Sequence, residues 1–169
     1  MNKPKVLHIV RHAKSSWDYQ NISDYDRPLK LRGIMNAYEM ARRLKIRNTL
    51  PELIITSPAN RALHTATIFA RVIELPFGQF NIDADFYGAD LENILNRIRE
   101  LDDKIHSVMI FGHNPEFTNL SNFLAKEPIG EVPTTGMVSV TFNTDKWKEL
   151  NKNKVTEVIF DFPKKEMQV

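Results

Sequence analysis

Cysteine is absent from this chain of 169 residues, which excludes both a disulfide framework and a zinc site built on thiolates. Long apolar runs are also missing: no stretch approaches the ~20 residues that a membrane-spanning helix needs, and none resembles a secretory leader. The net charge is only +2, and no basic block with interleaved aromatic residues is present. We therefore expect a cytoplasmic protein that binds neither nucleic acid nor membrane. Nothing in the sequence indicates an oligomeric state.

Short apolar segments alternate with amphipathic ones along the chain. The runs that have the pattern of parallel strands buried on both faces are residues 6–10, 53–56 and 108–111. The segments with an apolar stripe at helical spacing are residues 33–45, 62–73 and 91–101. Two alternating segments, residues 138–142 and 155–160, are expected to pair antiparallel at one edge.

This order of segments predicts an α/β protein, a three-layer α/β/α sandwich with a mostly parallel central sheet and an antiparallel edge. The length fits a single domain over residues 1–169, with its core at about residues 5–162. Such a chain has no room for large cap insertions over a site. We therefore expect any site at the sheet edge to be shallow and open.

Charged side chains directly follow each of the three buried runs. Arg11 and His12 end the first run, Arg61 follows the second, and His113 follows the third after Gly112. In an open α/β sheet, ligands bind outside the carboxyl ends of the strands, so these side chains are expected to converge. Two arginines and two histidines in one place predict a phosphate site that contains a nucleophile.

Arg61 gives a separate indication of an anionic ligand. We expect Ser57 or Asn60 to cap the helix that follows residues 53–56, which places Arg61 in or beside its first turn. A cation is unfavourable there, because the helix dipole prefers anions at that end. The alternative is a strand end simply solvated by basic residues, and the recurrence of the layout after three strands counts against it.

Four separated blocks agree with one known family in order and context. They are Arg11-His12-Ala13-Lys14-Ser15, then Asp26-Arg27-Pro28-Leu29 with Gly33, then Ser57-Pro58 with Arg61 and Thr65, and finally Gly112-His113-Asn114-Pro115. With these blocks the chain resembles the histidine phosphatase superfamily, which is phosphoglycerate mutase-like, and within it the small SixA-like branch of phosphohistidine phosphatases. The larger superfamily usually has glycine after the nucleophilic histidine, so Ala13 is a departure that resembles the small branch.

The resemblance implies a role for each member of the site. His12 would be the nucleophile and would pass through a covalent phosphohistidine. Arg11, Arg61 and His113 would surround the phosphoryl oxygens. Phosphoryl transfer asks a protein mainly for positioning and charge stabilisation, so no metal or other cofactor is required.

Other loop residues have weaker indications. Ser15 could donate a hydrogen bond to phosphate or could equally stabilise its loop, and Arg27 resembles a family position near the site. The pair Asp24 and Asp26 is a weak metal candidate, because solvated loop acids are far commoner than ligands.

The leaving group decides the substrate class. Phosphate esters expel a poor alkoxide, so their enzymes usually place a carboxylic acid beside it. In this family that acid would fall within residues 83–90, where Asp85 and Asp90 are candidates, although the stretch between them looks like the small branch, which lacks a dedicated acid. A phosphorylated imidazole can leave without one. Phosphohistidine on a protein partner is therefore the favoured substrate.

Two alternatives stay open. One is a small-molecule phosphomonoesterase of the same superfamily, which would need Asp85 or Asp90 as its general acid. The other is a non-catalytic phosphoprotein-binding module. The presence of both His12 and His113 counts against the module, because binding needs the arginines but no nucleophile.

Overall fold

The computed structural model describes residues 3–164, and its centre is one sheet of six strands in the order β3-β2-β4-β1-β5-β6. The strands are β1 (Lys5–Arg11), β2 (Leu53–Thr56), β3 (Phe80–Ile82), β4 (Ser107–Gly112), β5 (Met137–Phe142) and β6 (Val155–Asp161). The first four pair in parallel, whereas β5 pairs antiparallel with both β1 and β6. The predicted parallel sheet with an antiparallel edge is confirmed.

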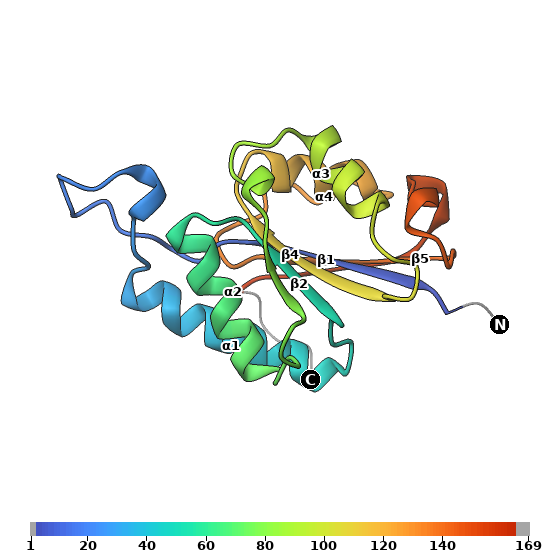
Figure 1. Ribbon diagram of the computed structural model, residues 1–169, viewed down its shortest axis with the longest axis horizontal. Helices are drawn as coiled ribbons and strands as arrows, with labels where there is room; N and C mark the ends of the chain where they lie inside the picture. Colours follow the sequence, from blue (N-terminus) through green and yellow to red (C-terminus); the bar gives the residue numbers. More distant parts are fainter. Residues whose placement is uncertain (1–2, 165–169) are drawn as a thin grey trace.

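Helices cover both faces of this sheet (Figure 1). On one face lie α1 (Leu31–Arg47) and α2 (Asn60–Val72), and on the other lie α3 (Leu91–Arg99) and α4 (Glu116–Leu124). Single 3-10 turns occupy Asp24–Asp26, Ala84–Phe86, Trp147–Glu149 and Lys152–Lys154. The architecture is the predicted three-layer α/β/α sandwich. The predicted domain span of 1–169 includes residues 1–2 and 165–169, which lie outside the described residues.

Side chains of the central strands alternate between two apolar cores. In β1, Leu7 and Ile9 join the core under α3 and α4, whereas Val10 joins the core under α1 and α2, and all are fully buried. β4 alternates in the same way. Burial on both faces explains why these strands are nearly continuous apolar runs. It also holds their carboxyl ends, which carry the predicted site, in a fixed register.

The ends of the helices differ from the predictions. α1 extends beyond both predicted ends, residues 33 and 45, and α3 stops before residue 101. The prediction that Ser57 or Asn60 caps α2 is wrong, because the N-cap residue is Ala59 and no side chain caps this end. The Ser57 hydroxyl contacts His113 instead. Arg61 lies in the first turn of α2, as predicted.

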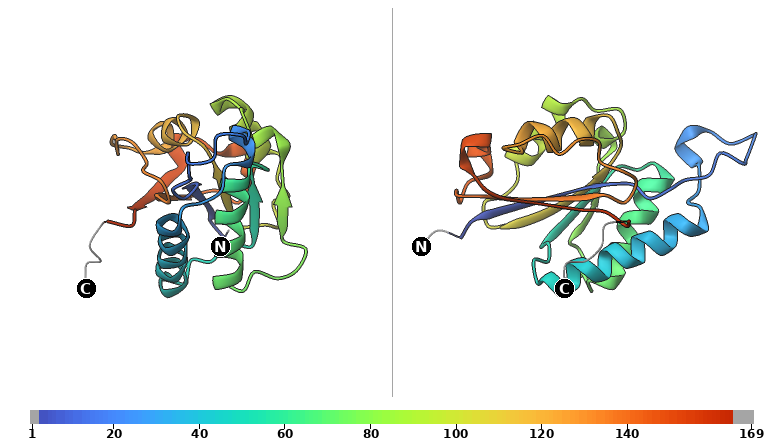
Figure 2. Two further views of the ribbon diagram at one scale, coloured as in Figure 1. Left: turned by 90° about the vertical axis from the view of Figure 1, so that its left-hand side faces the viewer. Right: turned by 180° about the vertical axis from the view of Figure 1, so that it is seen from behind.

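The segment between β1 and α1 extends away from the sheet and then returns (Figure 2). Its return is fixed by close backbone packing: Lys30 N–H donates to Lys14 O at 2.8 Å, and a Cβ on Gly33 would lie 2.3 Å from the same oxygen. Only glycine fits there without a shift. The start of α1 is therefore held beside the end of β1.

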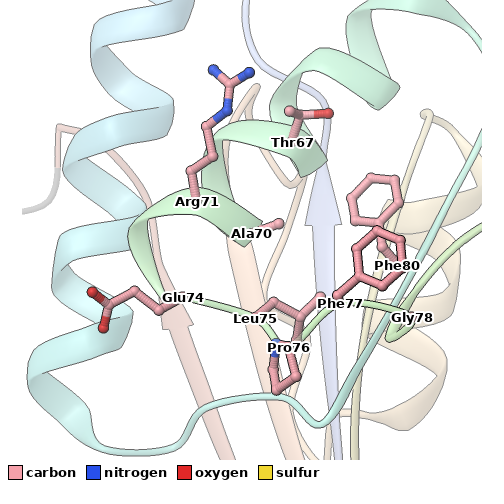
Figure 3. A pocket seen from close by; sticks show the side chains of 9 residues that line it. All are labelled: Thr67, Ala70, Arg71, Glu74, Leu75, Pro76, Phe77, Gly78 and Phe80. Carbon is pink, nitrogen blue, oxygen red and sulfur yellow. The ribbon is translucent and has the colours of Figure 1, made fainter.

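A hollow of about 560 Å³ lies at the other end of the molecule, between the end of α2 and the start of β3 (Figure 3). Its lining is mostly apolar, includes the fully exposed Phe77, and contains no histidine. Since β3 starts here, this hollow is at the amino ends of the parallel strands, away from the predicted site. Within residues 3–164, no helix is both long and apolar enough to cross a membrane.

Candidate active site

The carboxyl ends of β1, β2 and β4 meet at one edge of the sheet. Backbone hydrogen bonds continue across them: His12 N–H donates to Gly112 O at 3.0 Å, and Ser57 N–H donates to Phe111 O at 3.0 Å. The rings of His12 and His113 consequently lie close together, with centroids 5.2 Å apart. The predicted convergence of these strand ends is present in the fold.

The imidazole of His12 is held in one tautomer. Its Nδ1 lies 2.8 Å from the carbonyl oxygen of Ala13, which can only accept, so Nδ1 carries the proton. The backbone at Ala13 is itself held in place, because Ala13 N–H donates to Thr65 Oγ1 at 2.9 Å. In the neutral ring the lone pair is therefore on Nε2. This is the nitrogen that a nucleophilic His12 would use.

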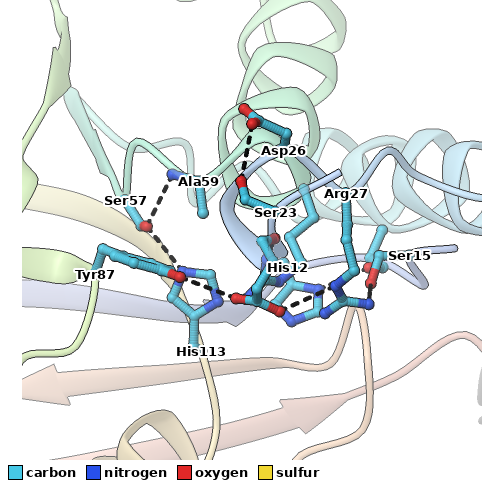
Figure 4. A network of polar contacts seen from close by, with 12 residues as sticks. His12, Ser15, Ser23, Asp26, Arg27, Ser57, Ala59, Tyr87 and His113 are labelled. Carbon is cyan, nitrogen blue, oxygen red and sulfur yellow. Dashed lines mark hydrogen bonds and ion pairs between the residues drawn. The ribbon is translucent and has the colours of Figure 1, made fainter. Parts of the chain in front are cut away.

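His113 is anchored by two neighbours (Figure 4). Its Nε2 shares a hydrogen bond of 2.8 Å with Ser57 Oγ, and its ring meets the ring of Tyr87 edge to face at a centroid distance of 5.6 Å. Its Nδ1 is buried and has no hydrogen-bond partner within residues 3–164. An unsatisfied buried polar atom costs ~1–3 kcal/mol, so it is retained where a ligand supplies the partner.

Burial keeps both histidines neutral. Burial, together with the charges of Arg61 and Arg11 and that of His113 when it is protonated, lowers the pKa of His12 to about 3 against the opposing effect of its hydrogen bond to Ala13. Burial and then the charge of Arg61 lower the pKa of His113 to about 4. A nucleophilic histidine must be unprotonated, and this environment meets that requirement at neutral pH.

Arg11 and Arg61 each retain an unused donor. Arg11 donates through Nη1 to Val132 O at 3.0 Å and lies 3.5 Å from Glu131 Oε1. In both arginines Nε is buried without a partner among the described residues. Together with Nδ1 of His113, these nitrogens suit an anion that accepts several hydrogen bonds at once.

Arg27 and Ser15 are both buried and bind each other: Arg27 Nη1 donates to Ser15 Oγ at 2.8 Å (Figure 4). The guanidinium also stacks on the ring of Trp17, 3.5 Å from its centroid. Ser15 thus holds Arg27 in place. Direct contact of either residue with phosphate stays a prediction.

The contact of Asp24 with the site arginines was not predicted from the sequence, which indicated Asp24 only as a weak metal candidate. Its Oδ1 accepts from Arg27 Nε at 3.0 Å, and its Oδ2 accepts from both Arg61 Nη2 and the Tyr87 hydroxyl at 3.0 Å. Burial alone would raise the pKa of Asp24, but the hydrogen bonds from Tyr87, Arg61 and Arg27 hold it below its ordinary value. Asp24 is therefore an ionised partner of two arginines. Within residues 3–164, no group of three or more His, Cys, Asp or Glu side chains could hold a metal ion.

Asp85 and Asp90, the predicted candidates for a general acid, are not among the groups that contact the histidines. Asp90 is the N-cap of α3, where its carboxylate accepts from Asn93 N–H at 2.9 Å. Asp85 lines an outer hollow together with Arg97 of α3. The structure thus gives Asp90 a local structural role, and a general-acid role for Asp85 stays a prediction.

Fold and site together define a class of protein. A model of the histidine phosphatase superfamily (branch 1) matches residues 7–113, and the chain belongs to this family. The matched region includes His12, Arg61 and His113. The family predicted from the four sequence blocks is thereby confirmed.

Particular relatives refine this placement. An uncharacterized chloroplastic protein of Arabidopsis thaliana is 30% identical over 129 residues, a match that covers 70% of this chain but only 58% of that protein, less than two thirds of its length. SixA from Agrobacterium tumefaciens, provisionally assigned as a phosphohistidine phosphatase, is 28% identical with a TM-score of 0.72, over 81% of this chain and 91% of that one. The protein histidine phosphatase SixA in complex with tungstate has the same fold, with a TM-score of 0.74 at 22% identity over 94% and 97% of the two chains.

Proposed function

We propose that this member of the histidine phosphatase superfamily removes the phosphoryl group from phosphohistidine on a protein partner. The reaction needs no metal ion and passes through a covalent phosphohistidine on His12. The observation that carries the proposal is the 2.8 Å contact between His12 Nδ1 and Ala13 O, which directs the lone pair to Nε2 in a pocket with two arginines. A module that only bound phosphate would need the arginines but not this neutral, tautomerically fixed imidazole.

The first step exchanges one phosphorus–nitrogen bond for another. Nε2 of His12 attacks phosphorus while the bond to the substrate imidazole breaks, and the electron pair stays on the departing nitrogen. The other nitrogen of the substrate ring keeps its proton, so the ring leaves as neutral histidine. Arg11 and Arg61 stabilise the charge on the phosphoryl oxygens in transit.

The second step returns the enzyme to its starting state. Water attacks the phosphorus of phospho-His12, its proton goes to the phosphate product, and the pair from the breaking bond returns to Nε2. Throughout both steps the proton on Nδ1 remains hydrogen-bonded to Ala13 O. The same contact that selects the nucleophilic tautomer thus stabilises the positively charged ring of the intermediate.

The position and charge of Asp24 support a nitrogen leaving group. Asp24 is the carboxylate bonded to Arg61, Arg27 and Tyr87, and these donors keep it ionised. An ionised carboxylate cannot protonate an alkoxide. A substrate ring that departs as neutral imidazole needs no such acid, whereas an alkyl phosphate does.

The test compares two substrates in the presence of a chelator. One is a protein phosphorylated on histidine with phosphoramidate, and the other is glycerol phosphate. We expect the phosphoprotein to be dephosphorylated and the ester to react at least about 100-fold more slowly, the size of general-acid assistance. Equal turnover of both substrates, or activity that returns only with a divalent ion, would overturn the proposal.

A further inference from the structure

A groove leads away from the site, starting at Arg11. Two hollows, of about 650 and about 560 Å³, share Lys14, Pro133, Thr134 and Phe162 in their linings and therefore adjoin each other. The first hollow includes Arg11, and the second reaches Lys164. We call the combined feature the basic groove.

Positive charge dominates the walls of the basic groove. Besides Arg11, its basic lining residues are Lys14, Lys30, Arg32 and Lys164. Among the described residues that line it, the one acid is Glu131, whose side chain is 76% exposed and lies beside Arg11. The whole chain has a net charge of only +2, so this is a local accumulation.

Four of these cations have no interaction partner among the described residues. Within residues 3–164, none of the side chains of Lys14, Lys30, Arg32 and Lys164 has a hydrogen bond or an ion pair with another residue. On α1, the helix that carries Arg32, the residues Arg43 and Arg47 both pair with Asp161. The four cations of the basic groove are therefore available to solvent or to a ligand.

Two of the cations also lie where they oppose helix stability. Lys30 is the N-cap of α1 and Arg32 is in its first turn, which contains no acidic residue. The helix dipole disfavours cations at this end. Because Lys14 O accepts from Lys30 N–H at 2.8 Å, the basic residues of the loop and of the helix are held next to one another.

Apolar residues also line the basic groove. They include Pro133 and Phe162, and the ring of Phe162 packs on that of Phe160 at a centroid distance of 5.2 Å. A groove lined by both apolar and basic residues matches a polypeptide that carries acidic side chains. A phosphohistidine that reaches His12 brings a flanking stretch of polypeptide with it, because it cannot arrive detached from its protein.

We propose that the basic groove binds an acidic stretch of polypeptide flanking the phosphohistidine of the partner, and so selects the protein on which the enzyme acts. This inference rests on the proposed function, since it names the kind of partner that the same site accepts. Charge complementarity makes the selection sensitive to salt, because exposed charges are screened.

The test uses two synthetic peptides, each with one histidine phosphorylated by phosphoramidate. Asp and Glu flank the histidine in the first, and Asn and Gln replace them in the second. We expect kcat/KM for the acidic peptide to be about tenfold higher, and this preference to shrink with added salt. Arg32→Glu should abolish the preference, with Lys30→Glu as a second variant. Hydrolysis of phosphoramidate itself, which has no flanking chain, should be unchanged.

Arg42→Glu is the matched control. It makes the same charge change on the same helix at an exposed residue that lies over the ring of Tyr38, outside the basic groove, and it should keep the preference. Binding of the unphosphorylated acidic peptide, followed by fluorescence anisotropy, supplies a readout independent of catalysis. If the wild-type protein hydrolysed none of these substrates but still bound the unphosphorylated acidic peptide, the proposed function would be wrong and the inference about the basic groove would stand. Absence of a preference, or one that Arg32→Glu leaves intact, overturns the inference.

Discussion

Asp24 and Arg61 meet through two hydrogen bonds, one from Nη2 to the carboxylate Oδ2 at 3.0 Å and one from Nη1 to the main-chain oxygen at 2.6 Å. The same carboxylate also accepts from Arg27. Carboxylate and phosphoryl oxygens use the same planar fork of guanidinium donors, so they compete for it. If Arg61 binds the phosphoryl group as proposed, Asp24 weakens the binding of free phosphate and favours its release after turnover.

Asp24→Asn is therefore expected to bind inorganic phosphate and tungstate about tenfold more tightly than the wild type, which corresponds to about 1.4 kcal/mol. The change is expected to be modest, because Asp24 pairs with both Arg61 and Arg27 but its side chain is 46% exposed. Titration calorimetry with phosphate measures the change directly. Inhibition by phosphate should become stronger in parallel.

The control for this experiment is Asp26→Asn. Asp26 belongs to the same 3-10 turn, but its carboxylate accepts from the Ser23 hydroxyl at 2.8 Å at an exposed position. Its replacement removes the same charge from the same loop and should leave the phosphate affinity unchanged. Weaker phosphate binding in Asp24→Asn would show instead that Asp24 holds the arginines in position for the ligand.

A second prediction concerns His12. His12→Ala should abolish turnover and leave tungstate binding within about tenfold of the wild type, because the arginines supply most of the attraction for an anion. Rapid quenching after incubation with a labelled phosphoprotein should trap label as acid-labile, base-stable phosphohistidine in the wild type only. A variant with undiminished turnover would remove His12 from the mechanism.

The fold was predictable because burial leaves a direct trace in the sequence. β1 and β4 are buried on both faces, so their residues form the continuous apolar runs from which the parallel sheet was inferred. The site histidines follow such strands, and the topology of an open sheet then brings them together. For His12 and His113, one sequence pattern therefore predicts both the fold and the position.

The rest depends on contacts between distant segments. Asp24 lies in the polar loop between β1 and α1, and only the path of that loop brings it to Arg61, 37 residues further on. One local signal could have indicated a contact for Asp24. Asp24 lies three residues before Arg27, and at this spacing the two side chains form the observed ion pair. The wrong prediction of a cap for α2 has the same cause: the Ser57 hydroxyl contacts the distant His113 and accepts from Ala59 N–H at 3.3 Å, but it does not cap the first turn of α2.

A third prediction concerns the pH dependence of stability. His8 is fully buried, its Nδ1 lies 2.7 Å from Ser139 Oγ, and burial lowers its pKa to about 4 from an ordinary value of 6.5. Below about pH 6.5 the unfolded chain binds a proton at His8 that the folded chain does not. The free energy of unfolding should therefore fall as the pH drops from 6.5 towards 4, by about 1.4 kcal/mol per pH unit for each such histidine.

His8→Gln isolates this contribution. The variant loses one titrating group, so its free energy of unfolding should decline less steeply than that of the wild type over the same pH range, whatever its stability at neutral pH. Urea denaturation at a series of pH values gives both slopes. Parallel curves for the two proteins would mean that His8 is protonated in the folded state as readily as in the unfolded one.

The final prediction separates the two substrate classes at the leaving group. Asp90 is occupied as the cap of α3, and Asp85 lines a hollow with Arg97, so we expect neither to protonate a leaving group. Asp85→Asn and Asp90→Asn should each change hydrolysis of a phosphohistidine protein by less than about tenfold, whereas a general acid normally contributes ~10²–10⁴-fold. Asp90→Asn should still lower stability slightly, because asparagine caps a helix nearly as well as aspartate but loses the favourable charge at the helix N-terminus. If either variant lost about 100-fold or more on an alkyl phosphate that the wild type turned over well, a small-molecule phosphomonoesterase would replace the phosphohistidine phosphatase proposed here.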